Sequence, residues 1–176
     1  MKTFLKELKF PSTEYTCLNN ITDDVRKAVS KSKVKNGLVV INSRHTTMGV
    51  LVQEICEPNL VKDFVEYALK NTPTDTRAHK AQKDFCYPTG DFCHRCQDNP
   101  LCDEIDLEYD AASHIRSMLY TQPTVSIPIH DGKLALGKYQ EIGAFEFDGR
   151  DGTGVNPIRQ RTIQVWIYPF EEVVKL

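Results

Sequence analysis

Apolar residues recur along the chain with two different periods, and these periods predict a mixture of helices and strands. Around residues 21–29, and again after Pro58, an apolar residue returns every three to four positions, which is the spacing of one helix face. A continuous apolar run at residues 38–41 and strict alternation at residues 125–129 are typical of strands. Since helices and strands do not follow a regular βαβ order, we expect a compact α+β domain with a largely antiparallel sheet and about three helices.

Turn and cap residues set the expected boundaries of these elements. Thr22 is a candidate N-cap for the first helix, which we expect to end at Asn36-Gly37. Asp131-Gly132 is a hairpin signal of the primed type. We therefore expect strands at residues 3–10, 14–17, 38–41, 48–52, 125–129, 133–136, 140–147 and 161–168, a second helix from Pro58 to about Asn71, and a third helix at 103–119 with Met118 and Leu119 in its core face.

Charge and hydropathy narrow the class of protein. The chain has 22 Lys plus Arg and 24 Asp plus Glu, a net charge of −2, whereas a dedicated nucleic-acid protein usually carries a basic surplus. No run approaches the ~20 apolar residues of a membrane span, and residues 1–7 interrupt their apolar positions with charges. We expect a cytoplasmic protein without nucleic-acid or membrane partners, folded as a single domain over residues 1–176 with a cysteine-rich insertion at about 80–103.

Five histidines are the first candidates for chemistry, because a neutral imidazole binds zinc and similar ions. His45 comes just after the predicted buried strand, in the kind of loop that often carries functional side chains. His114 lies four residues after Asp110 on the predicted third helix, so the acid could orient the ring or bind the metal itself. The plainer interpretations are a hydrogen-bonded core histidine for His45 and an ordinary surface pair for Asp110 and His114.

Four of the six cysteines fall within 17 residues, in the pattern C-x6-C-x2-C-x5-C. Four thiolates suit structural zinc or an iron–sulfur cluster, and the Cys-x-x-Cys pair lets two sulfurs converge on one ion. The other spacings match no standard motif, so one or two disulfides, or free thiols, stay open as alternatives. The remaining two, Cys17 and Cys56, are expected to be buried small hydrophobes. The candidate second metal site consists of Cys86, Cys93, Cys96 and Cys102.

The order of several short motifs resembles the YjbQ family, whose members are often labelled secondary thiamine-phosphate synthase enzymes. The resemblance covers most of the chain outside the cysteine-rich segment. Its parts are residues 37–40 leading into His45-Thr46-Thr47, then Glu54, Pro58, Asp63 and His79, then residues 110–115, 126–129, 132–140 and 148–150.

This resemblance implies a homotrimer with pockets near the subunit contacts and a divalent metal, expected to be zinc. The implied ligands are His45, His79 and His114, and the implied substrate is a small anion. The family usually has Asn where Asp110 stands, so an acid here would add negative charge near the metal. The further candidate site residues are Asp110, Gln140 and Glu54 for catalysis, and Arg150, Thr46 and Thr47 for substrate binding.

Three functions compete at this stage. The first is a metal-dependent enzyme acting on a small phosphorylated metabolite, either a thiamine-phosphate synthase-like transferase or a hydrolase. A metal would polarise a phosphoryl oxygen or activate water, and no hydroxyl near His45 has an identifiable activating base. The second is a non-catalytic trimer that binds a metal or a metabolite. The third is structural, with histidines and cysteines that only hold the fold together, and it predicts that His45→Ala lowers stability.

Overall fold

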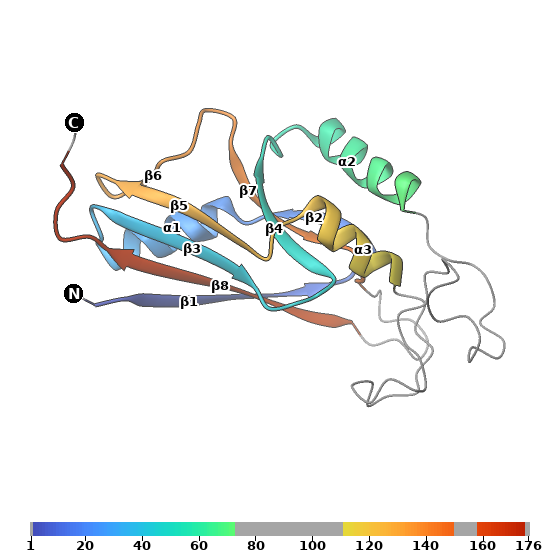
Figure 1. The fold of residues 1–176 in the computed structure, drawn as a ribbon, viewed down its shortest axis with the longest axis horizontal. Coiled ribbons are helices and arrows are strands. Elements are labelled where there is room, and N and C mark those ends of the chain that lie inside the picture. Colours follow the sequence, from blue (N-terminus) through green and yellow to red (C-terminus); the bar gives the residue numbers. More distant parts are fainter. Residues whose placement is uncertain (1, 73–110, 150–157, 175–176) are drawn as a thin grey trace.

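The computed structural model describes residues 2–72, 111–149 and 158–174, and its elements form two sheets with helices at their sides (Figure 1). The helices are α1 (Thr22–Ser32), α2 (Pro58–Asn71) and α3 (Ala111–Tyr120). The strands are β1 (Phe4–Ser12), β2 (Cys17–Asn20), β3 (Gly37–Ser43), β4 (Met48–Gln53), β5 (Thr124–His130), β6 (Lys133–Leu134), β7 (Glu141–Glu146) and β8 (Arg159–Pro169).

The described strands pair only in antiparallel fashion, which confirms the α+β class. One sheet has the order β1-β8-β3-β5-β6, and the other has the order β2-β7-β4. β8 therefore lies between β1 and β3, although it follows them by more than a hundred residues in sequence. β1 stands at one margin of the larger sheet, with β8 as its partner.

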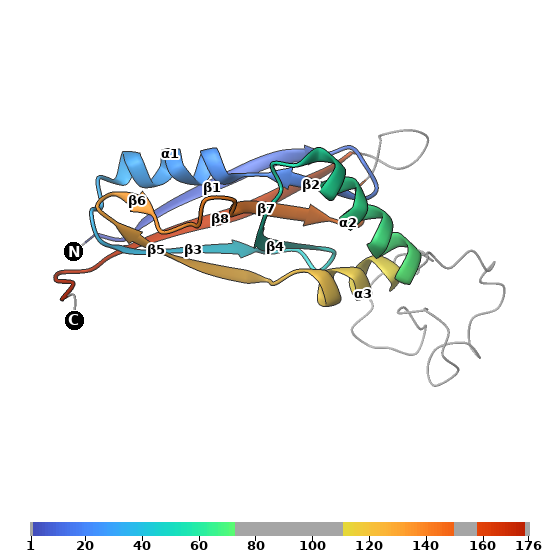
Figure 2. The same cartoon turned by 90° about the horizontal axis from the view of Figure 1, so that it is seen from above.

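The main core combines side chains of α1, of the larger sheet and of strands β4 and β7 in the smaller one, and α1 covers one face (Figure 2). Burial alternates strictly along β3, since successive side chains of a strand point to opposite faces. Removing these apolar side chains from water is the main stabilising contribution, at roughly 25 cal/mol per Å². The core consists of Ile21, Val25, Ala28, Val29, Val34, Val39, Ile41, Met48, Val50, Ile127, Ile129, Ile142, Ala144, Ile163, Val165 and Ile167.

Both predicted ends of the first helix are wrong. Ile21 occupies the N-cap position, and Thr22 is the first helical residue. The Asn20 side chain accepts the Thr22 backbone N–H at 3.0 Å, so the capping oxygen comes from two residues earlier in the chain. The helix stops at Ser32 because Lys33 adopts a left-handed conformation with φ of 58°, which ends a helix.

The predicted core face of the third helix is also wrong at two positions. Met118 is 81% exposed and Leu119 is 64% exposed, whereas Ser113 and Arg116 are fully buried. These polar side chains tolerate burial because they bond to carbonyl groups. The Ser113 hydroxyl donates to the Phe147 carbonyl at 2.6 Å, and Arg116 Nε donates to the Thr72 carbonyl at 2.8 Å. The first part of the predicted helix, residues 103–110, lies outside the described residues.

The remaining boundaries follow the sequence pattern with smaller shifts. The predicted primed hairpin is confirmed, because Asp131 and Gly132 both have positive φ, at 51° and 78°. The strand predicted at residues 14–17 begins only at Cys17, and β6 is two residues shorter than predicted. Cys56 is exposed rather than buried. No helix within the described ranges has the length and apolar character needed to cross a membrane.

Candidate functional site

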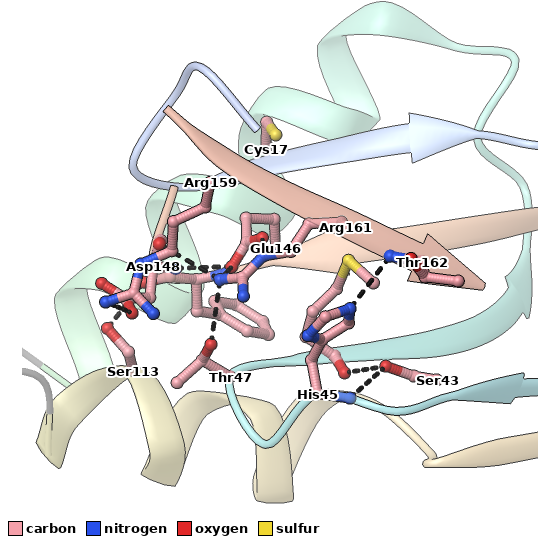
Figure 3. A network of polar contacts seen from close by, with 12 residues as sticks. Cys17, Ser43, His45, Thr47, Ser113, Glu146, Asp148, Arg159, Arg161 and Thr162 are labelled. Atoms are coloured by element: carbon pink, nitrogen blue, oxygen red, sulfur yellow. Dashed lines mark hydrogen bonds and ion pairs between the residues drawn. The ribbon is translucent and has the colours of Figure 1, made fainter. Parts of the chain in front are cut away.

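His45 lies in the turn that connects β3 to β4 (Figure 3). The buried Ser43 hydroxyl donates to the Met48 carbonyl at 2.6 Å and accepts the His45 backbone N–H at 3.2 Å. These two bonds join the end of one strand to the start of the next. The backbone that carries His45 and Thr46 is therefore held by its own flanking strands.

The His45 ring completes a hydrogen-bond ladder where β3 leaves the sheet. β3 pairs with β8 as far as Ser43 opposite Ile163, and the next backbone N–H along β8 belongs to Thr162. That N–H donates to His45 Nε2 at 2.9 Å (Figure 3). Because Nε2 is an acceptor here, the neutral ring carries its proton on Nδ1. The imidazole thus takes the place of a strand carbonyl.

The surroundings of His45 favour this neutral form. Burial lowers the pKa of His45 below its ordinary value of 6.5, and the Arg161 guanidinium lowers that pKa further. Arg44 and Arg159 act in the same direction, while Glu146 opposes them. A proton on Nε2 would also lie against the Thr162 N–H. The hydrogen bond and the surrounding charges therefore both favour the neutral ring.

Replacing His45 by Ala is expected to lower the free energy of unfolding by about 1–2 kcal/mol near neutral pH, because the Thr162 N–H loses its acceptor. The lowered pKa of His45 gives this contribution a pH dependence. Above about 6.5 the ring is neutral in both states and its contribution is complete. As the pH falls below that value, the unfolded chain takes up a proton before the folded one, so the contribution is lost.

Urea denaturation of the wild type and of His45→Ala between about pH 7.5 and pH 5.5 measures both effects. The difference in stability between the two proteins is expected to shrink as the pH falls. His130→Ala is the matched control, because the His130 side chain is 69% exposed. An unchanged difference across this range would contradict the assigned role of the ring.

A buried ion pair joins the two sheets beside this turn. Glu146 on β7 is 0% exposed and Arg161 on β8 is 4% exposed. The guanidinium contacts both carboxylate oxygens of Glu146 and donates to Thr47 Oγ1 at 3.1 Å. Glu146 Oε1 also accepts the backbone N–H groups of Phe147 and Asp148, at 3.0 and 2.8 Å. These contacts satisfy a charge pair that would be unfavourable without them.

A second ion pair continues the network toward solvent. Arg159 forms an ion pair with Asp148, with 2.9 Å between Nη2 and Oδ2 and side-chain exposures of 28% and 4%. The Asp148 carbonyl accepts a bond from Arg161 at 3.2 Å, which ties the two pairs together. Through Thr47, the His45 turn is therefore hydrogen-bonded to a connected network of two ion pairs (Figure 3).

The sequence interpretation did not identify Glu146 and Arg161 as site residues. The sequence did indicate Arg161. Every second residue of β8 faces inward, and Arg161 occupies one of these positions together with Ile163, Val165 and Ile167. A charged residue at an inward strand position needs a buried partner. Glu146 gave a weaker signal, because buried residues run continuously along its strand and alternation does not distinguish them.

The predicted substrate-binding residues Thr46 and Thr47 lie in different surroundings. Thr46 is exposed, whereas Thr47 is 4% exposed and its hydroxyl accepts a bond from Arg161. In this arrangement Thr47 positions the turn, and Thr46 is free to meet a ligand. His114 is half-buried on α3, next to the fully buried Ser113.

One chain does not bring Glu54 and Gln140 to His45. Glu54 follows the last residue of β4 and Gln140 precedes the first residue of β7, and these strand ends are paired. His45 lies beyond the opposite end of β4, where Met48 pairs with Glu146. Five residues of strand separate the two ends, which is roughly 17 Å.

The other predicted site residues fall outside the described part of the chain. Among residues 2–72, 111–149 and 158–174, no three His, Cys, Asp or Glu side chains are placed to hold one metal ion. The predictions that the structure does not describe concern His79, Asp110, Arg150, Cys86, Cys93, Cys96 and Cys102.

The geometry of His45 does not fit a metal ligand. A ligating imidazole offers a nitrogen lone pair and donates from its other nitrogen. Here Nε2 accepts the Thr162 N–H, which leaves the proton on Nδ1, so neither nitrogen has a free lone pair. Metal binding by His45 would leave that backbone N–H without its acceptor. The three-histidine metal site therefore stays a prediction.

The arrangement of the two sheets and the helices matches that of solved YjbQ-type structures. A YbjQ-like protein of unknown function from Sulfolobus solfataricus superposes with a TM-score of 0.70, at 24% identity, over 96% of this chain and 99% of that one. A conserved protein of the YjbQ/UPF0047 family from Clostridium acetobutylicum gives a TM-score of 0.67 at 25% identity, over 92% and 98% of the two chains. The fold is thus that of a compact α+β domain of the YjbQ type.

The chain belongs to the family described as UPF0047 protein YjbQ-like, whose model matches residues 6–169. A UPF0047 protein from Methanocaldococcus jannaschii is 32% identical over 132 residues, which are 75% of this chain and 76% of that protein. One from Archaeoglobus fulgidus is 30% identical over 143 residues, or 81% and 90% of the two chains. The resemblance noted from the sequence motifs is therefore confirmed at the level of the family.

Proposed function

We propose that the chain acts on a small phosphorylated metabolite, whose anionic group binds at the His45 turn. The observation that supports this proposal is the charge around the ring. The guanidinium groups of Arg44, Arg159 and Arg161 all disfavour the protonated form of His45, with Glu146 opposing them. Burial, the largest cause of the lowered pKa of His45, disfavours a charge of either sign, but the arginines favour a negative one. The same charges disfavour a metal cation at this position.

The exposed part of the turn supplies hydrogen-bond donors for such an anion. Arg44 and Thr46 are exposed, and neutral His45 carries a further donor on Nδ1. A guanidinium is suited to phosphate because its paired N–H groups match two phosphate oxygens. The buried pair of Arg161 and Glu146 would position the turn through Thr47 rather than touch the ligand.

Two activities are compatible with this binding mode. The family resemblance favours an enzyme, a transferase of the thiamine-phosphate synthase type or a hydrolase. It also implies a zinc ion held by His45, His79 and His114, but the hydrogen bond that His45 Nε2 accepts from Thr162 does not fit that role, so the proposed anion site uses only the side chains of the turn. The alternative is a trimeric protein that holds the metabolite without turning it over.

Arg44→Ala is expected to weaken binding of inorganic phosphate and of pyrophosphate by roughly tenfold to a hundredfold, the loss of one charged hydrogen-bond donor. Isothermal titration calorimetry measures this directly. Arg26→Ala serves as the control, because Arg26 is an exposed arginine of α1 that pairs with Asp23 at 3.1 Å, away from the turn. Equal binding by Arg44→Ala and the wild type would contradict an anion site at the turn.

An assay of turnover distinguishes the enzyme hypothesis from the hypothesis of a non-catalytic binding protein. The full chain is saturated with zinc and given a panel of phosphate esters, together with a pyrimidine diphosphate and a thiazole phosphate. Product and pyrophosphate release are then followed. Release that is weakened by Arg44→Ala supports the enzyme, and binding without release supports the non-catalytic alternative. Release that Arg44→Ala leaves unchanged would place the chemistry elsewhere in the molecule.

A further inference from the structure

A groove runs between the edge strand β1 and the flank of α1, away from the His45 turn. Its volume is about 310 Å³. The floor is apolar and includes Phe4, Leu8 and Ile167, all of which pack on the main core. The rim carries Lys6 from β1 and further lysines from α1. The groove therefore combines an apolar floor with a basic rim.

A second hollow, of about 540 Å³, adjoins the groove and shares Phe4 and Ser32 with it. The two hollows together are lined by six lysines against two acids, Asp24 and Glu171, although the whole chain has a net charge of −2. Asp24 and Lys27 pair with each other at 3.3 Å, which leaves five lysines against Glu171. The six lysines are Lys2, Lys6, Lys27, Lys31, Lys33 and Lys35.

The backbone beside this groove is also available for pairing. β1 is nine residues long and ends the strand order of the larger sheet, and β8 is its partner among the described strands. Figure 1 shows β1 at the margin of that sheet. The outer N–H and C=O groups of an edge strand are a template for one more strand. An extended ligand could therefore use the strand edge and the groove together.

We propose that this groove binds an extended acidic segment of a partner protein, which adds to β1 as a further strand. Side chains alternate along such a segment. One set would cover Phe4 and Leu8 on the groove floor, and carboxylates would meet Lys6, Lys27 and Lys31 on the rim. Main-chain hydrogen bonds supply affinity in this mode, and the alternating side chains supply specificity.

The charges argue against two other occupants. A second copy of β1 would bring its own Lys6 to a rim that already carries Lys6, Lys27 and Lys31, and like charges on neighbouring strands are destabilising. An anionic lipid surface would neutralise the lysines, but it would leave the edge of β1 without a strand partner. An acidic strand satisfies both the charges and the backbone.

A nine-residue peptide in which glutamate alternates with valine, blocked at both ends, is a suitable probe. We expect saturable binding to the full chain at low ionic strength, measured by calorimetry. Lys27→Glu/Lys31→Glu is expected to weaken this binding by about tenfold or more. Lys62→Glu/Lys70→Glu on α2 is the matched control, since both lysines are exposed and the change in net charge is the same. Circular dichroism checks that each variant is folded.

Further arms test the strand geometry and the identity of the occupant. The peptide methylated on alternate backbone nitrogens is expected to bind at least about tenfold more weakly, because it loses strand hydrogen bonds. Hydrogen exchange is expected to slow within Phe4–Ser12 when the unmodified peptide is bound. Absence of peptide binding, or equal binding by the methylated peptide, would overturn the proposal. Binding to anionic lipid vesicles but not to the peptide would also overturn it. So would a change of oligomeric state in Lys27→Glu/Lys31→Glu, detected by light scattering.

Discussion

Glu146→Gln is expected to lower the free energy of unfolding by about 3–5 kcal/mol, the largest effect of any single substitution considered for this chain. The substitution keeps the size of the side chain but removes its charge. Arg161, which is 4% exposed, would then carry a buried positive charge without its carboxylate partner. Urea denaturation followed by circular dichroism measures the loss.

The double variant Glu146→Gln/Arg161→Met tests the cause of this loss, because Gln keeps an acceptor oxygen for the Phe147 and Asp148 N–H groups. Removing both charges is expected to recover most of the stability, because the penalty arises from the charge left alone rather than from the missing attraction. Asp23→Asn is the control, since its partner Arg26 and Asp23 itself are both more than half exposed, and the expected loss is below about 1 kcal/mol. A loss of that small size for Glu146→Gln would show that the buried pair is not fixed as described.

Gly149→Ala is expected to lower the free energy of unfolding by about 2–3 kcal/mol, through overpacking against the backbone. A Cβ at this position would collide with the Glu14 carbonyl oxygen and the Ser12 hydroxyl. The Gly149 N–H also donates to the Tyr15 carbonyl at 3.1 Å, so the two segments cannot separate without losing this bond. The same displacement would disturb Asp148 in the site network. Thermal and urea denaturation check the prediction.

Gly137→Ala gives the matched comparison for this effect. Its added Cβ would approach only the end of the exposed Gln140 side chain, at 3.3 Å, and that side chain can move away. We expect a change smaller than about 0.5 kcal/mol there. Similar losses for the two glycine variants would mean that the backbone contact at Gly149 is not the cause.

Much of the fold could be predicted from the sequence, because local periodicity is set by one face of each element. The continuous apolar run at residues 38–41 and the helical spacing after Pro58 predicted strand β3 and helix α2. The prediction was wrong where polar groups are buried with partners from distant segments. Arg116 is buried on α3 because the Thr72 carbonyl accepts its hydrogen bonds, and nothing local to α3 indicates that carbonyl.

The candidate site was predicted less completely for the same reason. His45 was identified from its position after a strand, but its acceptor role depends on Thr162, a residue 117 positions away. Gln140 and Glu54 were grouped with His45 through the family resemblance, and the pairing of β4 with β7 places them at the opposite end. Residue types at given spacings do not specify which ends of paired strands meet.

The position of β8 in the larger sheet has a consequence for synthesis of the chain. β8 separates β1 from β3, so these two earlier strands have no direct partner in each other. β3 can pair with β5 before β8 is made, but β1 has no other partner among the described strands until residues 159–169 have left the ribosome. The apolar side chains of β1 therefore lack their sheet for most of translation, a period in which nascent chains are prone to aggregate. A nascent chain stopped before Arg159 is the form in which a chaperone would meet this protein.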